Sequence, residues 1–294
     1  MHRPTPPISA IIVTLNEGDQ LRQTVEHFER SLPDHSEIIV VDDGSTDGSV
    51  DFLRDRADHV RVITTPGVGV ARARNAGGRV AGGEVLVFAD AHITMDPGCW
   101  QPLIEELQNP GVGAVNPAVC DMQFPVDNGY GMAFGGFDLS SKWLYDKPAA
   151  PTPVPLLIWA CAAIRRSLFE ESGGFDEGMI RWGSIDNEMS FRLWLEGYEL
   201  RVVPSVKVAH LFRSTRPYPM TWSAALHNRL RLALVHFEAD HRARVVEALR
   251  SHDDFPEAAA LMADSDIASR RRTLMPRKVR DSVWWFEAVA PVIS

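Results

Sequence analysis

Residues 84–92, EVLVFADAH, form an apolar, β-branched run that ends in an acid, a small residue and a histidine. A short apolar run of this kind is typical of a strand buried on both faces of a sheet. Four similar runs occur in the first 118 residues: ISAIIVTL (8–15), SEIIVVD (36–42), VRVITT (60–65) and GVGAVNP (111–117). Stretches with helical character lie between the runs, near residues 19–31, 47–56, 70–81 and 98–108. This alternation predicts βαβ units and an α/β fold with a mostly parallel sheet.

Acidic turns follow three of the predicted strands. TLNEGD follows the first strand, DDGSTDGS the second, and DAH the strand at 84–90. Each of them alone would be read as an ordinary turn. Because ligands of such sheets bind at the carboxyl ends of the strands, three acidic turns at one edge predict a binding site there.

The composition is that of a soluble globular protein, with 294 residues, 45% hydrophobic, 23% charged and a net charge of −9. This negative charge argues against nonspecific electrostatic binding to nucleic acid. Three cysteines without a CxxC pair argue against a disulfide framework and against a thiolate zinc site. The N-terminus lacks the apolar core of a signal peptide, and no apolar run approaches the roughly 20 residues that span a bilayer. We therefore expect a cytoplasmic protein without a transmembrane segment.

The second half of the chain has a different character. Residues 119–156 are rich in Pro, Gly and aromatic residues and predict an ordered lid or an acceptor groove, whereas residues 222–290 have a helical pattern. We expect a catalytic domain at 1–220 and a helical extension at 221–294. The basic and aromatic segment 270–287 could touch an anionic membrane or an acceptor. The favoured interpretation is that its aromatics pack on the body of the protein or on a second subunit, as in a homo-oligomer.

Five stretches resemble, in order, the motifs of family 2 glycosyltransferases: VTLNE, VVDDGSTDGS, ARARNAGG, VLVFADAH and the region from GGFDEGM to EGYEL. The resemblance covers roughly residues 8–218 and implies a GT-A fold, the nucleotide-diphospho-sugar transferase fold. It also implies a sugar-nucleotide donor. The stretch from WGSIDNEMSF to HLFRSTRPY is similar to polypeptide N-acetylgalactosaminyltransferases. In those enzymes Asp-x-His replaces the usual Asp-x-Asp, and a histidine in a VGHVFR-like segment completes the metal site; the matching segment here is VAHLFR.

The resemblance implies a metal site formed by Asp90, His92 and His210. Asp90 and His92 are two residues apart at a strand end, so their side chains can point to the same side. Mixed imidazole and carboxylate ligands suit Mn²⁺ or another borderline divalent cation better than Ca²⁺. A cation there would stabilise the charge that builds on the leaving phosphate.

The donor side of the site is predicted partly from chemistry and partly from the resemblance. The Asp43 carboxylate at a strand end can accept the uracil N–H, which favours a UDP-sugar. The resemblance implies these further donor contacts: Thr14 and Glu17 beside the base and ribose, Arg74 and Asp90 facing the donor, Trp182 near the diphosphate, and Arg213 and Tyr218 from a lid at 212–218.

Asp186 is the candidate catalytic residue. In inverting family 2 enzymes the matching acid is the general base, whereas in the retaining N-acetylgalactosaminyltransferases the nearby acid contacts the sugar, so the stereochemistry stays open. The chain also departs from the family patterns. Ile185 replaces the glutamate of a Glu-Asp pair, Gly67 stands where a donor-contacting arginine is expected, and Trp159 and Ala160 replace paired glycines beside the sugar. The last change predicts an altered sugar pocket.

We therefore expect a metal-dependent glycosyltransferase that moves a HexNAc or hexose from a UDP-sugar to a peptide Ser, Thr or Cys side chain or to a glycan. An alternative is a family 2 transferase that acts on polysaccharides or lipids. A sugar-nucleotide nucleotidyltransferase would need a Gly-rich basic loop after the first strand, where TLNEGDQ is acidic. A non-catalytic nucleotide-sugar-binding protein is the remaining alternative.

Overall fold

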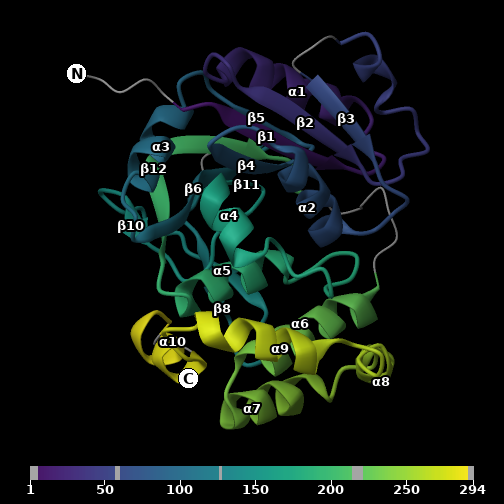
Figure 1. Ribbon diagram of the computed structural model, residues 1–294, viewed down its shortest axis with the longest axis vertical. Helices are drawn as coiled ribbons and strands as arrows, with labels where there is room; N and C mark the ends of the chain where they lie inside the picture. The colour runs from purple at the N-terminus through teal and green to yellow at the C-terminus, as the bar shows by residue number, and fades with distance from the viewer. Residues whose placement is uncertain (1–5, 57–59, 126–127, 214–220, 291–294) are drawn as a thin grey trace.

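A mixed sheet forms the centre of the protein in a computed structural model that describes residues 6–56, 60–125, 128–213 and 221–290. Within these ranges, ten strands belong to this sheet: β1 (Ile8–Thr14), β2 (Glu37–Asp42), β3 (Val60–Thr64), β4 (Val85–Asp90), β5 (Ile93–Met95), β6 (Val112–Asp121), β7 (Asn128–Gly129), β10 (Thr152–Pro153), β11 (Cys161–Arg165) and β12 (Glu199–His210). The main path has the order β10-β12-β6-β11-β4-β1-β2-β3 (Figure 1). Two further strands, β8 (Met132–Phe134) and β9 (Ser141–Trp143), pair with each other.

The five predicted strands are present, and each begins within one residue of its predicted start. β3, β2, β1 and β4 are parallel neighbours, and β6 is parallel to β12. The antiparallel β11 lies between β4 and β6 and makes the sheet mixed. The predicted helix at 47–56 was wrong, because this stretch holds one short 3₁₀ turn at Asp51–Leu53. The Asp47 carboxylate accepts the N–H groups of Ser49 and Gly18, which favours a turn over a helix.

Helices cover both faces of the sheet: α1 (Asp19–Ser31), α2 (Val70–Val80), α3 (Trp100–Leu107), α4 (Arg166–Ser172) and α5 (Ile185–Leu195). Side chains of a strand alternate between its two faces. In β4, Val85 and Val87 pack with α1 and α3, and we call this side the α1 face. Leu86 and Phe88 pack with α2, α4 and α5 on the α2 face. β1, β2, β4 and β6 are therefore buried on both sides, as their apolar runs predicted, whereas the edge strand β3 is largely exposed.

β12 pairs with β6 in two registers. Leu200–Val203 lie opposite Ala114–Pro117, and Lys207–His210 lie opposite Ala118–Asp121. Residues 204–206 are therefore extra on β12 and form a bulge. Before the bulge, Leu200 and Val202 lie on the α2 face. After the bulge, Val208 lies on the α1 face, so the bulge changes which face the even-numbered residues occupy.

The C-terminal helices α6 (Trp222–His236), α7 (Ala239–Leu249), α8 (Phe255–Ala260), α9 (Ile267–Leu274) and α10 (Ser282–Ala288) gather beside α5 (Figure 1). Trp285 of α10 is fully buried, with its ring 5.5 Å from that of Phe134 and 4.8 Å from that of Phe191. The aromatics of the 270–287 segment thus pack on the body of this chain. In the part of the chain that the structure describes, no helix combines the length and the apolar character needed to cross a membrane.

A charged network lies in the buried interface between α5 and α6. Arg192 Nε donates to Glu188 Oε1 at 2.8 Å, and His236 Nε2 lies 2.9 Å from the same oxygen. Each of the three side chains is at most 1% exposed to solvent. Burial lowers the pKa of His236 from 6.5 to about 4, although Glu188 acts in the opposite direction. His236 is therefore neutral near pH 7 and donates to Glu188 from Nε2, while its Nδ1 has no partner among the described residues.

We expect the stability of the protein to fall between pH 7 and pH 5. The folded-state pKa of His236 is depressed, so the unfolded chain takes up a proton below pH 6.5 that the folded chain takes up only near pH 4. Between pH 7 and pH 5 the free energy of unfolding of wild type should fall by about 2 kcal/mol more than that of His236→Gln. The glutamine amide can still donate to Glu188 but does not titrate. Urea unfolding at both pH values measures the difference. Equal losses in the two proteins would contradict a neutral, buried His236.

Candidate functional site

Three side chains from the predicted metal site meet at the carboxyl end of β4. Asp90 ends β4, His92 precedes β5, and His210 ends β12. β5 pairs with β12 so that Ile93 lies opposite His210, which brings the two histidines together. His210 Nε2 lies 3.3 Å from Asp90 Oδ2, and one ligand atom from each of the three side chains falls within 4.8 Å of the others. Two imidazoles and a carboxylate at this spacing fit a divalent cation of the Mn²⁺ or Zn²⁺ type.

Glu17 joins the metal site to Arg213. It lies just after β1 and is 7% exposed. Its Oε2 lies 3.1 Å from His92 Nδ1 and accepts from the Arg213 guanidinium at 2.6 Å. Burial would raise the pKa of Glu17, but the hydrogen bonds and charges of His92 and Arg213 lower it. The sequence predicted Glu17 and Arg213 as separate donor contacts, and it gave no signal of the contact between them.

Arg74 links Asp186 to the candidate metal site, because its guanidinium contacts both Asp186 and Asp90. Asp186 lies in the first turn of α5, and its Oδ1 accepts from Arg74 at 2.6 Å. The same guanidinium, 3% exposed, donates to Asp90 at 3.4 Å and to the carbonyl of Trp159 at 3.1 Å. Burial raises the pKa of Asp186 despite the charge of Arg74. Burial acts on Asp90 in the same sense, but His210 and Arg74 hold the pKa of Asp90 well below its usual range. Arg74 thus orients both acids; its predicted contact with a donor stays a prediction.

Two predicted donor residues lie at the carboxyl ends of β1 and β2. Asp43 accepts from Thr65 Oγ1 and Val68 N with Oδ1 and from Gly69 N with Oδ2. Its carboxylate therefore orders the 65–69 loop and uses about three of its four acceptor positions on described residues. The hydroxyl of Thr14 is buried and has no partner among the described residues.

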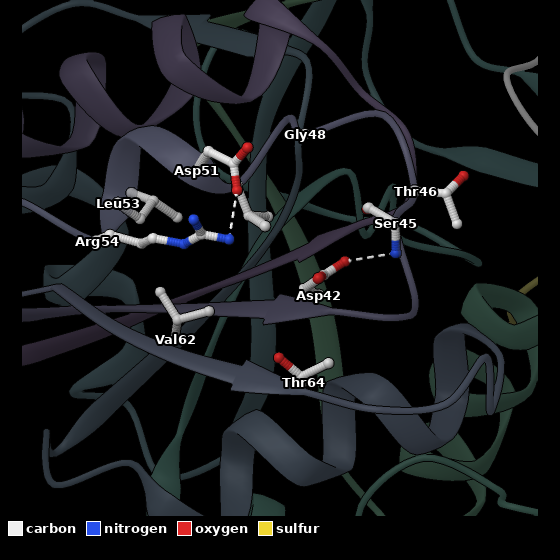
Figure 2. Close-up of a pocket in the computed structure, with 10 residues that line it drawn as sticks. Asp42, Ser45, Thr46, Gly48, Asp51, Leu53, Arg54, Val62 and Thr64 are labelled. Carbon is white, nitrogen blue, oxygen red and sulfur yellow. Dashed lines mark hydrogen bonds and ion pairs between the residues drawn. The ribbon is translucent and has the colours of Figure 1, made fainter.

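The neighbouring acid, Asp42, belongs to a separate concavity. Its Oδ1 accepts from the Ser45 N–H at 2.8 Å and shapes the acidic turn (Figure 2). A pocket of about 550 Å³ lies beside this turn, between the ends of β2 and β3. The lining residues are Asp42, Ser45, Thr46, Gly48, Val50, Asp51, Leu53, Arg54, Val62 and Thr64. None of the predicted site residues is among these described lining residues.

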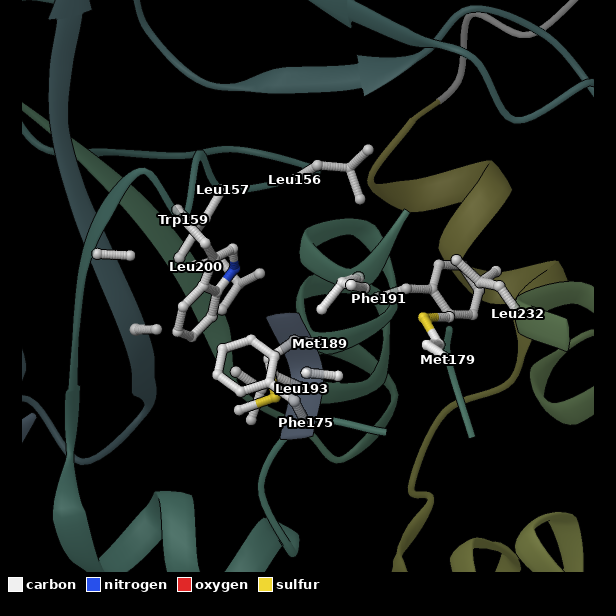
Figure 3. Packing of buried hydrophobic residues seen from close by; sticks show 14 of the residues in the cluster. Leu156, Leu157, Trp159, Phe175, Met179, Met189, Phe191, Leu193, Leu200 and Leu232 are labelled. Atoms are coloured by element: carbon white, nitrogen blue, oxygen red, sulfur yellow. The ribbon is translucent and has the colours of Figure 1, made fainter. Parts of the chain in front are cut away.

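The remaining predicted residues are placed as follows. Trp182 precedes α5 and is 39% exposed, and Tyr218 lies outside the described residues. Trp159 is expected to alter the sugar pocket, and this stays a prediction. Its ring is fully buried on the α2 face, where Nε1 donates to Ser190 Oγ at 3.1 Å (Figure 3). Trp159 lies in the turn just before β11, and its ring packs against that of Phe175.

Two solved structures share the architecture. The first is described as "Crystal structure of GalNAc-T7 with UDP, GalNAc and Mn2+"; it is 23% identical, has a TM-score of 0.84 and matches 97% of this chain and 57% of that chain. The second is a mannosyltransferase from Pyrobaculum calidifontis in complex with GDP-Man and Mn²⁺, 22% identical with a TM-score of 0.58, matching 92% of this chain and 72% of that chain. These likenesses confirm the predicted GT-A fold.

Curated relatives are similar in sequence as well. The human "Probable polypeptide N-acetylgalactosaminyltransferase 8" is 27% identical over 98% of this chain and 48% of the relative. Polypeptide N-acetylgalactosaminyltransferase 3 of Taeniopygia guttata is 32% identical over 79% of this chain and 42% of the relative. The chain thus spans about half the length of the curated relatives that it matches.

A sequence model of one family matches residues 9–173, more than half of the chain. The matched range begins at the second residue of β1, continues past β4, and contains Asp90 and His92, two of the three residues of the candidate metal site. The chain therefore belongs to glycosyl transferase family 2.

Proposed function

We propose that the protein is a glycosyltransferase that uses a divalent cation, Mn²⁺ by preference, to transfer a sugar from a UDP-sugar. The observation that carries this proposal is the convergence of Asp90, His92 and His210 at the carboxyl end of the sheet. The relatives named as polypeptide N-acetylgalactosaminyltransferases support the activity, and the similar structure described with UDP, GalNAc and Mn²⁺ supports the donor and the cation.

Each residue has a distinct task in this proposal. The cation supplies charge stabilisation for the leaving diphosphate. Thr14 and Asp43, at the ends of β1 and β2, bind the nucleoside in this proposal; among the described residues the Thr14 hydroxyl has no partner, and Asp43 accepts three hydrogen bonds. Arg213 lies within reach of the same edge through its contact with Glu17 and would add a positive charge beside the diphosphate.

The proposed sugar is a HexNAc or a hexose, and the proposed acceptor is the Ser, Thr or Cys side chain of a peptide. The acceptor class rests on the named activity of the curated relatives, about half of whose length the chain matches. A polysaccharide or lipid acceptor is the alternative within the same family.

A panel of nucleotide sugars tests the proposed function directly. UDP-GalNAc, UDP-GlcNAc, UDP-glucose, UDP-galactose and GDP-mannose would be incubated with Mn²⁺, with and without peptides that carry Ser, Thr or Cys. Release of UDP that requires Mn²⁺ and increases with a peptide is the expected result. Release from GDP-mannose alone would overturn the UDP assignment, and binding without any release would indicate a non-catalytic protein.

Asp186→Asn should reduce turnover by about 10²-fold or more if the reaction inverts the anomeric carbon, because the acceptor would lose its general base. Donor binding should be kept, since the amide remains isosteric with the acid. Initial rates and UDP binding measure the two effects, and NMR of the product gives the linkage. A retained anomeric configuration would remove the base role and leave Asp186 as a sugar contact.

A further inference from the structure

The imidazole of His92 has different surroundings at its two nitrogens. Nδ1 lies 3.1 Å from Glu17 Oε2, and the His92 side chain is 17% exposed where that of Glu17 is 5% exposed. A neutral imidazole carries a proton on one nitrogen and a lone pair on the other. With Nδ1–H donated to a buried carboxylate, the lone pair of His92 is on Nε2.

We propose that Glu17 is the positioning residue of the metal site, an assignment that rests on the proposed function. It holds His92 in the tautomer and ring orientation that leave Nε2 free for the cation. A carboxylate behind a histidine ligand also increases the electron density on the ligating nitrogen. Glu17 thereby acts through His92, and the reacting groups need not touch it.

The backbone around Glu17 is built to aim its carboxylate inward. Both neighbours have positive φ angles, 56° at Asn16 and 54° at Gly18. Two hydrogen bonds tie Asn16 to the acidic turn. Its backbone N–H donates to Ser45 Oγ at 2.9 Å, and its side-chain Oδ1 accepts from the Thr46 N–H at 2.8 Å. A strained conformation that the surroundings fix in this way is common at functional positions.

Arg213 balances the charge of Glu17. It donates to the same oxygen that faces His92, so the carboxylate has a cationic partner before any metal ion is considered. This pairing fixes the rotamer of the Glu17 carboxylate.

His210 lacks a comparable support. Its Nε2 faces Asp90, and its buried Nδ1 has no partner in the described part of the chain. Its place is set instead by the pairing of β12 with β5 and β6. The positioning effect of Glu17 should therefore be specific to His92.

Mn²⁺ affinity tests the assignment without any substrate. The signal of free Mn²⁺ in electron paramagnetic resonance would be titrated with wild type, Glu17→Gln and the control Glu37→Gln. Glu37 is a carboxylate in the same sheet that accepts from Ser9 and Gly82 and lies at the opposite end of the strands. Glu17→Gln should weaken Mn²⁺ binding by about 10- to 100-fold, a typical effect of losing a partner behind a metal ligand, and Glu37→Gln should bind as wild type does.

Two further measurements separate positioning from a general structural role. In a His92→Ala background, Glu17→Gln should cause no further loss of affinity. Nitrogen-15 spectra of the wild-type histidines, assigned by comparison with His92→Ala, should show the proton of His92 on Nδ1. A proton on Nε2, or equal Mn²⁺ affinity in wild type and Glu17→Gln, overturns the assignment. Absence of Mn²⁺ binding in wild type instead overturns the metal site of the proposed function, and the role of Glu17 with it.

Discussion

Replacing either His92 or His210 with alanine should lower Mn²⁺-dependent transfer by at least about 10³-fold, because a cation at the leaving group supplies several kcal/mol of charge stabilisation. The two histidines come from different elements but share one candidate ion with Asp90. The double variant should therefore be little worse than either single variant, since the ion can be lost only once. Turnover and Mn²⁺ titration of the three proteins give the comparison.

His27→Ala is the matched control for these variants. His27 lies on α1, and its Nδ1 is 3.0 Å from the carbonyl of Met95 at the end of β5, close to the site but outside it. The control should bind Mn²⁺ as wild type does. If the His92 and His210 variants instead each cause a modest loss and the double variant shows their product, the two residues do not share an ion.

Arg192→Met should destabilise the protein by about 3–5 kcal/mol, because it leaves the buried carboxylate of Glu188 without its cation. Arg192 also donates to the carbonyls of Ser172 and Gly174, which would lose their partners. These contacts fix α5, whose first turn carries Asp186. Urea unfolding at pH 7 measures the free energy of unfolding.

Two comparisons make this result specific. Arg250→Met removes an exposed helical pair with Glu247, whose side chains are 64% and 66% exposed, and should change stability by less than about 1 kcal/mol. Replacing Glu188 with Gln in the Arg192→Met protein should recover part of the loss, because no uncompensated charge then remains. No recovery in the double variant would show that the loss comes from packing rather than from the buried charge.

Much of the sheet could be predicted from the sequence because its parallel strands are continuous β-branched runs. β11 could not, since CAAIR is short and rich in alanine. It is a strand because the space between β4 and β6 offers it backbone partners on both sides. Residues 47–56 were predicted as a helix because the local pattern does not show that Asp47 bonds to a residue 29 positions away.

The candidate metal ligands were identified through the family resemblance, and the structure brings them together. The contacts of Glu17 with His92 and Arg213 span 75 and 196 residues of sequence. They depend on the conformation of Asn16 and Gly18, which no periodicity reveals. The sequence did not reveal the buried position of Arg74, because an arginine near the start of a helix has the same local pattern whether it is solvated or enclosed.

The bulge at residues 204–206 makes the chain sensitive to insertions and deletions at this place. The number of residues between the two paired stretches of β12 decides which residue stands opposite Asp121, and at present it is His210. If one residue were deleted while the shape of the bulge and the register before it were kept, Leu211 would occupy that position and present an apolar side chain. Evolution can therefore substitute residues along β12 more freely than it can change the length of the strand. We expect a homologous chain one residue shorter here to lose a candidate metal ligand.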